Sequence, residues 1–165
     1  MVNRSGKVRQ ETNIADIPAT TLAQYCPDLQ SWPQRWQYDE HDLPVGQEIV
    51  ECFSPFLLEL LASDLAPKTL RRHRDNLWLL GGELIRRRYE DTRLKKLPAQ
   101  QAIAELIEPD GGPLIWPRIS QTDQDSLDAT CRRLYKFLEA REKPAAGMAY
   151  PPSASHLWTS RLVCQ

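Results

Sequence analysis

The feature that most constrains the fold is residues 65–88, where leucines recur at the period of an α-helix. Leu70, Leu77, Leu80 and Leu84 fall on one side of a helix, with His73 among them. The opposite side holds polar residues, namely Lys68, Arg71, Arg72, Asp75 and Arg86. The pattern predicts an amphipathic helix whose leucines enter a core. The Gly81–Gly82 pair would weaken it by roughly 1 kcal/mol per glycine, so either a neighbouring helix crosses closely there or the helix breaks in two, and we favour the close crossing.

Three further stretches also have helical periodicity. The first runs from about Gly46 to Asp64, where we expect Pro55 to cause a kink or a late helix start. A short helix fits Pro98–Ile107, and the last begins near Ser120, a good N-cap residue. No stretch alternates as a strand would. The sequence therefore predicts an all-α fold with four helices of unequal length.

The segments around these helices contain many prolines. The frequent prolines of residues 1–46 predict an irregular arm with one short helical turn near residues 19–25. We expect Trp32 and Trp36 to pack on the body and anchor the arm rather than to stack on bases. Leu114, Ile115 and Trp116 should fold the loop before Ser120 onto the core. Residues 143–165 predict a tail that could dock through Leu157, Trp158 and Leu162. The expected domain is thus 47–142, between arm and tail.

Charge is segregated along the sequence although the formal net charge is only −1. Residues 65–96 hold ten basic and four acidic side chains, a balance of +6, and the rest of the chain has a balance of −7. Such a block fits a surface that faces a polyanion, and it also fits an ordinary solvated helix face.

The cysteines and the apolar runs indicate a reduced, cytoplasmic protein. The four cysteines, Cys26, Cys52, Cys131 and Cys164, show no C-x-x-C spacing or zinc pattern, and Cys52 and Cys131 fall on apolar helical faces. No apolar run is long enough for a membrane span, and the N-terminus has no apolar signal region. We expect no cofactor, no metal and no membrane association.

Patterns for catalysis are missing from the sequence. The triplet His73–Asp75 reads HRD, but Leu80 stands where a kinase catalytic loop needs Asn. His73 on an apolar face is best interpreted as a hydrogen-bonded core histidine. We find no nucleophile with a suitably spaced base and no phosphate-binding loop, so we expect no enzyme.

The helical pattern resembles a known family. Residues 56–85 resemble the first two helices of the core-binding, SAM-like domain of tyrosine recombinases (phage-type integrases), through Phe56, Leu57, Leu61, Thr69 and Leu77. The stretch SLDATCRRLYKFLEAR, residues 126–141, is similar to the last helix of that domain. The resemblance covers about residues 47–142 and implies a four-helix orthogonal bundle that clamps duplex DNA.

The chain also departs from the family. His73 stands where Tyr is usual, and residues 88–119 exceed the compact third-helix region. The catalytic Arg…His-x-x-Arg…Tyr set is not present, so recombination chemistry is not implied for this chain alone. The resemblance places DNA contacts on the second and fourth helices, and the cationic face adds Arg86. The candidate DNA-binding residues are Lys68, Thr69, Arg71, Arg72, Arg86, Arg132, Arg133 and Lys136.

Two functions follow, and a third reading remains. The first is a non-catalytic DNA-binding accessory module, related to recombinase core-binding domains. The alternative is a protein-interaction or regulatory helical module, such as an antitoxin-like partner of a protein encoded nearby, with no nucleic-acid role. The third is an open-reading-frame remnant with no selected activity.

Overall fold

The computed structural model describes residues 17–143, and this part of the chain is all-α, as predicted. Its α-helices are α1 (Ile17–Tyr25), α2 (Trp32–Trp36), α3 (Asp42–Ala62), α4 (Pro67–Glu90), α5 (Thr92–Lys96), α6 (Ala99–Leu106) and α7 (Gln121–Glu142). A 3-10 turn, Leu29–Ser31, precedes α2. The expected docking residues of the tail, Leu157, Trp158 and Leu162, lie outside the described residues.

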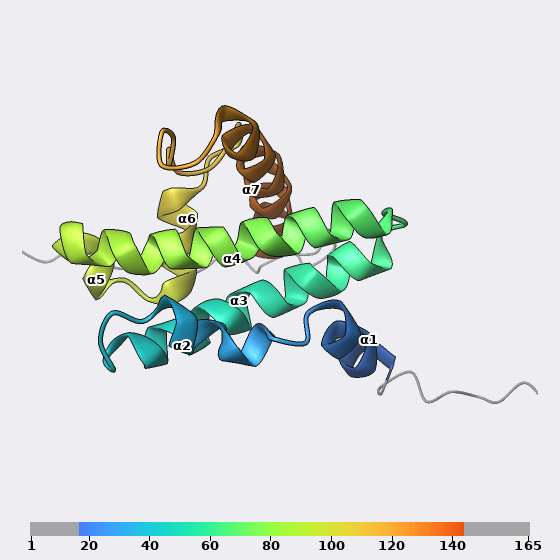
Figure 1. Cartoon of the computed structure of the whole chain (residues 1–165), viewed down its shortest axis with the longest axis horizontal. Helices are drawn as coiled ribbons and strands as arrows, with labels where there is room; N and C mark the ends of the chain where they lie inside the picture. Colours follow the sequence, from blue (N-terminus) through green and yellow to red (C-terminus); the bar gives the residue numbers. More distant parts are fainter. Residues whose placement is uncertain (1–16, 144–165) are drawn as a thin grey trace, which may run out of the picture.

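The helices α3 and α4 run side by side along the molecule (Figure 1). α3 begins at Asp42, earlier than expected, because Pro44 lies in the first turn, where a missing N–H breaks no helical bond. The Asp42 carboxylate also accepts the N–H groups of Tyr38 and Asp39, at 2.9 and 3.1 Å. Pro55 lies inside α3 and does not interrupt it, so the late helix start was wrong.

The N-terminal segment packs on one side of this helical pair (Figure 1). Trp32 and Trp36 are buried, with ring centroids 5.5 Å apart, which confirms that they anchor the arm. The Trp36 ring lies over the glycine pair of α4, where a Cβ on Gly81 would come within 2.4 Å of it. The close approach predicted at the glycines is therefore real, but a tryptophan side chain makes it.

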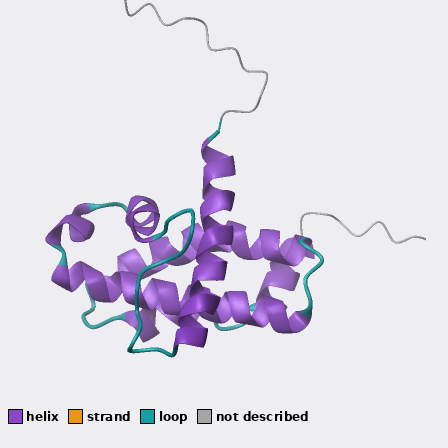
Figure 2. Cartoon of the chain, turned by 90° about the horizontal axis from the view of Figure 1, so that it is seen from above, coloured by secondary structure: helices purple, strands orange, loops and turns teal. Residues whose placement is uncertain are grey.

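The last helix, α7, crosses the long helices steeply, and its C-terminal end projects beyond them (Figure 2). Ser120 caps it by accepting the N–H of Asp123 at 3.0 Å, as predicted. In the preceding loop Ile115 is buried, but Leu114 and Trp116 are exposed, so the expectation that they enter the core was wrong. The buried Gln124 holds this loop by its backbone, because its Oε1 accepts the N–H groups of Ile115 and Trp116 at 2.8 and 3.0 Å.

Candidate nucleic-acid interface

The candidate site begins where α4 and α7 are joined by buried polar side chains. His73 Nδ1 lies 2.8 Å from Thr130 Oγ1, and Asn76 Nδ2 donates to Thr130 Oγ1 at 2.8 Å. Asn76 also donates to the carbonyl oxygen and hydroxyl of Ser126, both at 3.0 Å. These bonds confirm that His73 is a hydrogen-bonded core residue. They fix the residues on either side of the junction relative to one another.

Basic side chains from both helices flank this junction, and we call them the basic face: Lys68, Arg71, Arg72, Arg133 and Lys136. Arg133 is half-buried and the other four are exposed. Within residues 17–143, none of the five side chains makes a hydrogen bond or ion pair to the protein. Asp75, one turn further along α4, is paired with Arg74 at 3.0 Å. The basic face therefore keeps its charges available to a ligand.

Cations from both helices lie close enough to His73 to affect its pKa. Burial lowers the pKa of His73 below its ordinary value, and the positive charges of Arg133 and Arg72 lower it further. One cation comes from each helix. The charge of the His73 imidazole is therefore coupled to cations of the basic face on both α4 and α7.

The other three predicted residues lie apart from this arrangement. Thr69 is half-buried in the first turn of α4, and Arg132 donates from Nη1 to the carbonyl oxygen of Asp110 at 3.0 Å. Arg86 lies further along α4 and is paired with Glu83 and Glu90. Arg86 therefore lacks the unpaired charge that the basic face has, and its role in DNA binding stays a prediction.

A buried carboxylate organises this second group of arginines. Glu83 is almost fully buried and accepts from Arg86 Nη2 at 2.8 Å, Arg87 Nε at 2.7 Å and Arg118 Nη2 at 2.9 Å. Burial alone would raise the pKa of Glu83, but hydrogen bonds from the three arginines outweigh it and lower the pKa to about 2. We call Glu83, Arg86, Arg87 and Arg118 the Glu83 cluster. It ties α4 to the loop before α7.

Sequence reasoning missed the Glu83 cluster and the Asn76 bridge. The spacing of Glu83 to Arg86 and Arg87, three and four residues apart, is the signal for the helical part of the cluster. Nothing in the sequence indicates Arg118, which reaches Glu83 from 35 residues away.

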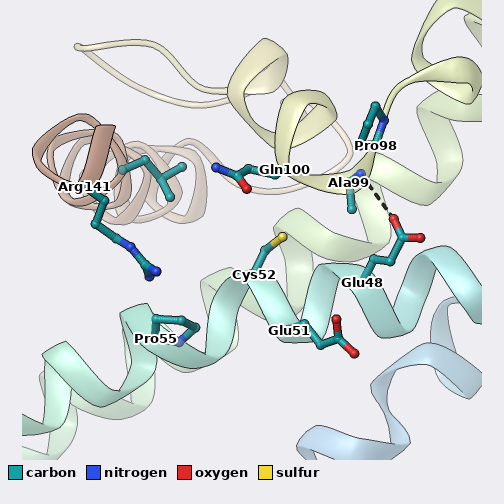
Figure 3. A pocket seen from close by; sticks show the side chains of 9 residues that line it. Glu48, Glu51, Cys52, Pro55, Pro98, Ala99, Gln100 and Arg141 are labelled. Carbon is teal, nitrogen blue, oxygen red and sulfur yellow. Dashed lines mark hydrogen bonds between the residues drawn. The ribbon is translucent and has the colours of Figure 1, made fainter. Parts of the chain in front are cut away.

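A separate cleft of about 330 Å³ lies among α3, α6 and α7 (Figure 3). Cys52 lies at its centre, with Glu48, Glu51 and Arg141 around it. Burial raises the pKa of the Cys52 thiol, and the two glutamates raise it further. The thiol therefore stays protonated near neutral pH and is a poor nucleophile.

Within residues 17–143, His, Cys, Asp and Glu side chains form no group of three that could hold a metal ion. No helix of this part is long and apolar enough to cross a membrane. Comparison with known protein families, curated proteins and solved structures finds no match to this chain.

Proposed function

We propose that the chain is a DNA-binding accessory module that holds duplex DNA through the basic face and carries out no chemistry itself. The observation that carries this proposal is the set of five cations that have no partner within residues 17–143, on two helices joined at His73 and Thr130. Lys and Arg side chains bind the DNA backbone by neutralising phosphates, which positions a protein with little readout of base sequence. The resemblance of residues 47–142 to recombinase core-binding domains supports the same use of the second and last long helices.

The proposal is tested by titrating a fluorescein-labelled 20-base-pair duplex with the full chain at several salt concentrations. Five phosphate contacts predict that log affinity falls with log salt at a slope of about −4.5. The double variant Arg72→Gln/Arg133→Gln should reduce the magnitude of that slope by about 1.8.

The matched control is Arg93→Gln/Lys96→Gln, which removes two exposed cations from α5. It should leave affinity and slope nearly unchanged. Absent or salt-independent duplex binding would end the proposal, as would equal losses in the two double variants.

The exposed loop before α7 favours a second candidate function, a protein-interaction module. Leu114 is 67% exposed and Trp116 is 51% exposed, which is unusual for large apolar side chains that have a core beside them. If this function is correct, the chain forms a stoichiometric complex with the product of a neighbouring gene. Leu114→Ser/Trp116→Ser should then break the complex and leave duplex binding intact.

A further inference from the structure

A second hollow on the surface combines aromatic and cationic side chains. It lies between the end of α2, the outer side of α4 and the loop before α7, with a volume of about 300 Å³. We call it the Trp78 cleft, and the side chains that carry its chemistry are Arg35, Tyr38, Trp78, Glu83, Arg86 and Arg118. It lies outside the basic face, because Trp78 is six residues beyond Arg72, or about 9 Å along α4.

The aromatic surface of this cleft is exposed and well supported. Trp78 is 41% exposed, although tryptophan side chains are usually well buried. The Trp36 indole N–H donates to the carbonyl oxygen of Trp78 at 3.0 Å, and the buried Trp36 ring forms part of the cleft. The backbone that carries Trp78 is therefore fixed while its ring remains available for contact.

The cations of the cleft are arranged for an anion. Arg118 and Arg86 are held by Glu83, so binding orders them little further. Arg35 is 60% exposed, and its ion-pair contact, with Asp28, is 4.0 Å long. Arg86 is paired with Glu83 and Glu90, so the three arginines of the cleft oppose two carboxylates and leave an excess of one positive charge.

Arg35 and Trp78 also line an adjoining hollow of about 260 Å³. Trp32 contributes to that hollow, and its buried indole N–H has no acceptor among the described residues. The space on both sides of Trp78 therefore extends along the groove between α2 and α4. A ligand seated against Trp78 would have Arg35 within the same groove.

We propose that the Trp78 cleft binds a nucleotide unit with an unpaired base, which stacks on Trp78 while its phosphate meets Arg35 and Arg118. A flat aromatic ring beside fixed guanidinium groups suits a ligand that is both planar and anionic. Bases inside a duplex are already stacked on each other, so the site would take a free nucleotide or a nucleotide of a single strand. This inference goes beyond duplex binding by the basic face and does not depend on it.

The test uses fluorescence anisotropy of fluorescein-labelled ten-residue oligothymidylate with the full chain. Trp78→Ala should weaken binding about tenfold or more, and Trp78→Phe should restore most of it. Arg35→Ala, an exposed change that leaves the core untouched, should also weaken binding severalfold. Matched controls are Trp116→Ala and Arg93→Ala, which remove an exposed tryptophan and an exposed arginine outside the cleft.

Competition with adenosine monophosphate distinguishes the two sources of the ligand. Displacement of the oligonucleotide by the mononucleotide would assign the cleft to free nucleotides, and failure to displace it would assign the cleft to single strands. The proposal is overturned if neither probe binds, or if the cleft variants and their controls lose affinity equally. A blunt duplex measured with the same variants keeps this result separate from the basic face, because Trp78→Ala should leave duplex binding unchanged.

Discussion

At the scale of single residues, the absence of a side chain at Gly81 decides how the N-terminal segment packs. The Trp36 ring occupies the space that a Cβ at position 81 would fill. The sequence predicted a close approach there because glycine destabilises a helix interior, and close packing would explain why two glycines occur in one. It could not predict that a tryptophan 45 residues earlier makes the approach, since only the three-dimensional path of the arm brings Trp36 to that place.

The two glycines therefore predict responses to alanine of different size. Gly81→Ala should destabilise the protein by about 1–3 kcal/mol through overpacking against Trp36, despite the helix propensity that alanine adds. At Gly82 the new Cβ would lie 3.2 Å from the Trp36 ring, so Gly82→Ala should change stability much less. Urea unfolding of the two variants measures the difference. Equal stabilities would show that the ring does not lie over Gly81.

Glu83 predicts a larger effect of a single residue. Glu83→Gln leaves three arginines near one another without the carboxylate that holds them, and we expect a loss of about 2–3 kcal/mol, reduced from the fully buried case by the partial exposure of the arginines. The measurement is the free energy of unfolding at pH 7, with the exposed pair variant Glu105→Gln as a control.

The pH dependence of stability should differ between wild type and Glu83→Gln. The folded pKa of Glu83, about 2, lies below its ordinary value of 4.5. Its contribution is therefore present above pH 4.5 and is lost as the pH falls toward 2. The two proteins should converge in stability across that range. A constant gap between pH 7 and pH 2 would contradict the assignment.

At the scale of elements, the pairing of α4 with α7 links the polar core to the basic face. The leucine period predicted the buried side of α4 correctly, because burial in helices follows a fixed spacing. It also placed Lys68, Arg71 and Arg72 on the outside. It did not predict that Arg86 is paired with Glu83 and Glu90, because a helical wheel shows which side a residue faces and not which carboxylate engages it.

DNA binding should change the titration of His73. Phosphates near Arg72 and Arg133 would offset the positive field that helps to lower the His73 pKa, so the pKa should rise on binding. By linkage, duplex affinity should then increase as the pH falls below 6.5, the ordinary value of a histidine, at constant salt. NMR titration of the His73 ring protons, with and without duplex, measures this.

The Arg72→Gln/Arg133→Gln variant supplies the comparison for that titration. Without duplex, the His73 pKa of this variant should lie above the His73 pKa of the wild type. Addition of duplex should no longer shift the His73 pKa of the variant. If duplex binds tightly and the wild-type His73 pKa does not move, the contact surface lies elsewhere.

At the scale of the whole molecule, the N-terminal arm shares one hydrophobic core with the long helices. Cys26, Leu29, Trp32 and Trp36 from the arm are buried in the same cluster as the residues of α3, α4, α6 and α7. From the sequence, we predicted a boundary between the arm and the helical domain at residue 46, because the prolines of the arm forbid long helices. The sequence predicted that Trp32 and Trp36 anchor the arm, but not that short helices between the prolines place the arm in the same core as the long helices.

A shared core predicts that the arm and α7 unfold together. Burial raises the pKa of both the Cys26 and the Cys131 thiols to about 12, so neither should react readily with N-ethylmaleimide in the folded protein. In a Cys52→Ser/Cys164→Ser background, both cysteines should become reactive at the same urea concentration as the loss of helical circular dichroism. Earlier labelling of Cys26 would show that the arm detaches first.

The hydroxyl of Tyr89 donates to the Asp42 carboxylate at 2.7 Å and joins the end of α4 to the start of α3. At the far end of the same pair, residues 63–66 connect the helices covalently. The helices α3 and α4 are thus linked to each other at both ends. A chain cut in that short connection should therefore keep the register of α3 against α4 and reassemble from its two fragments.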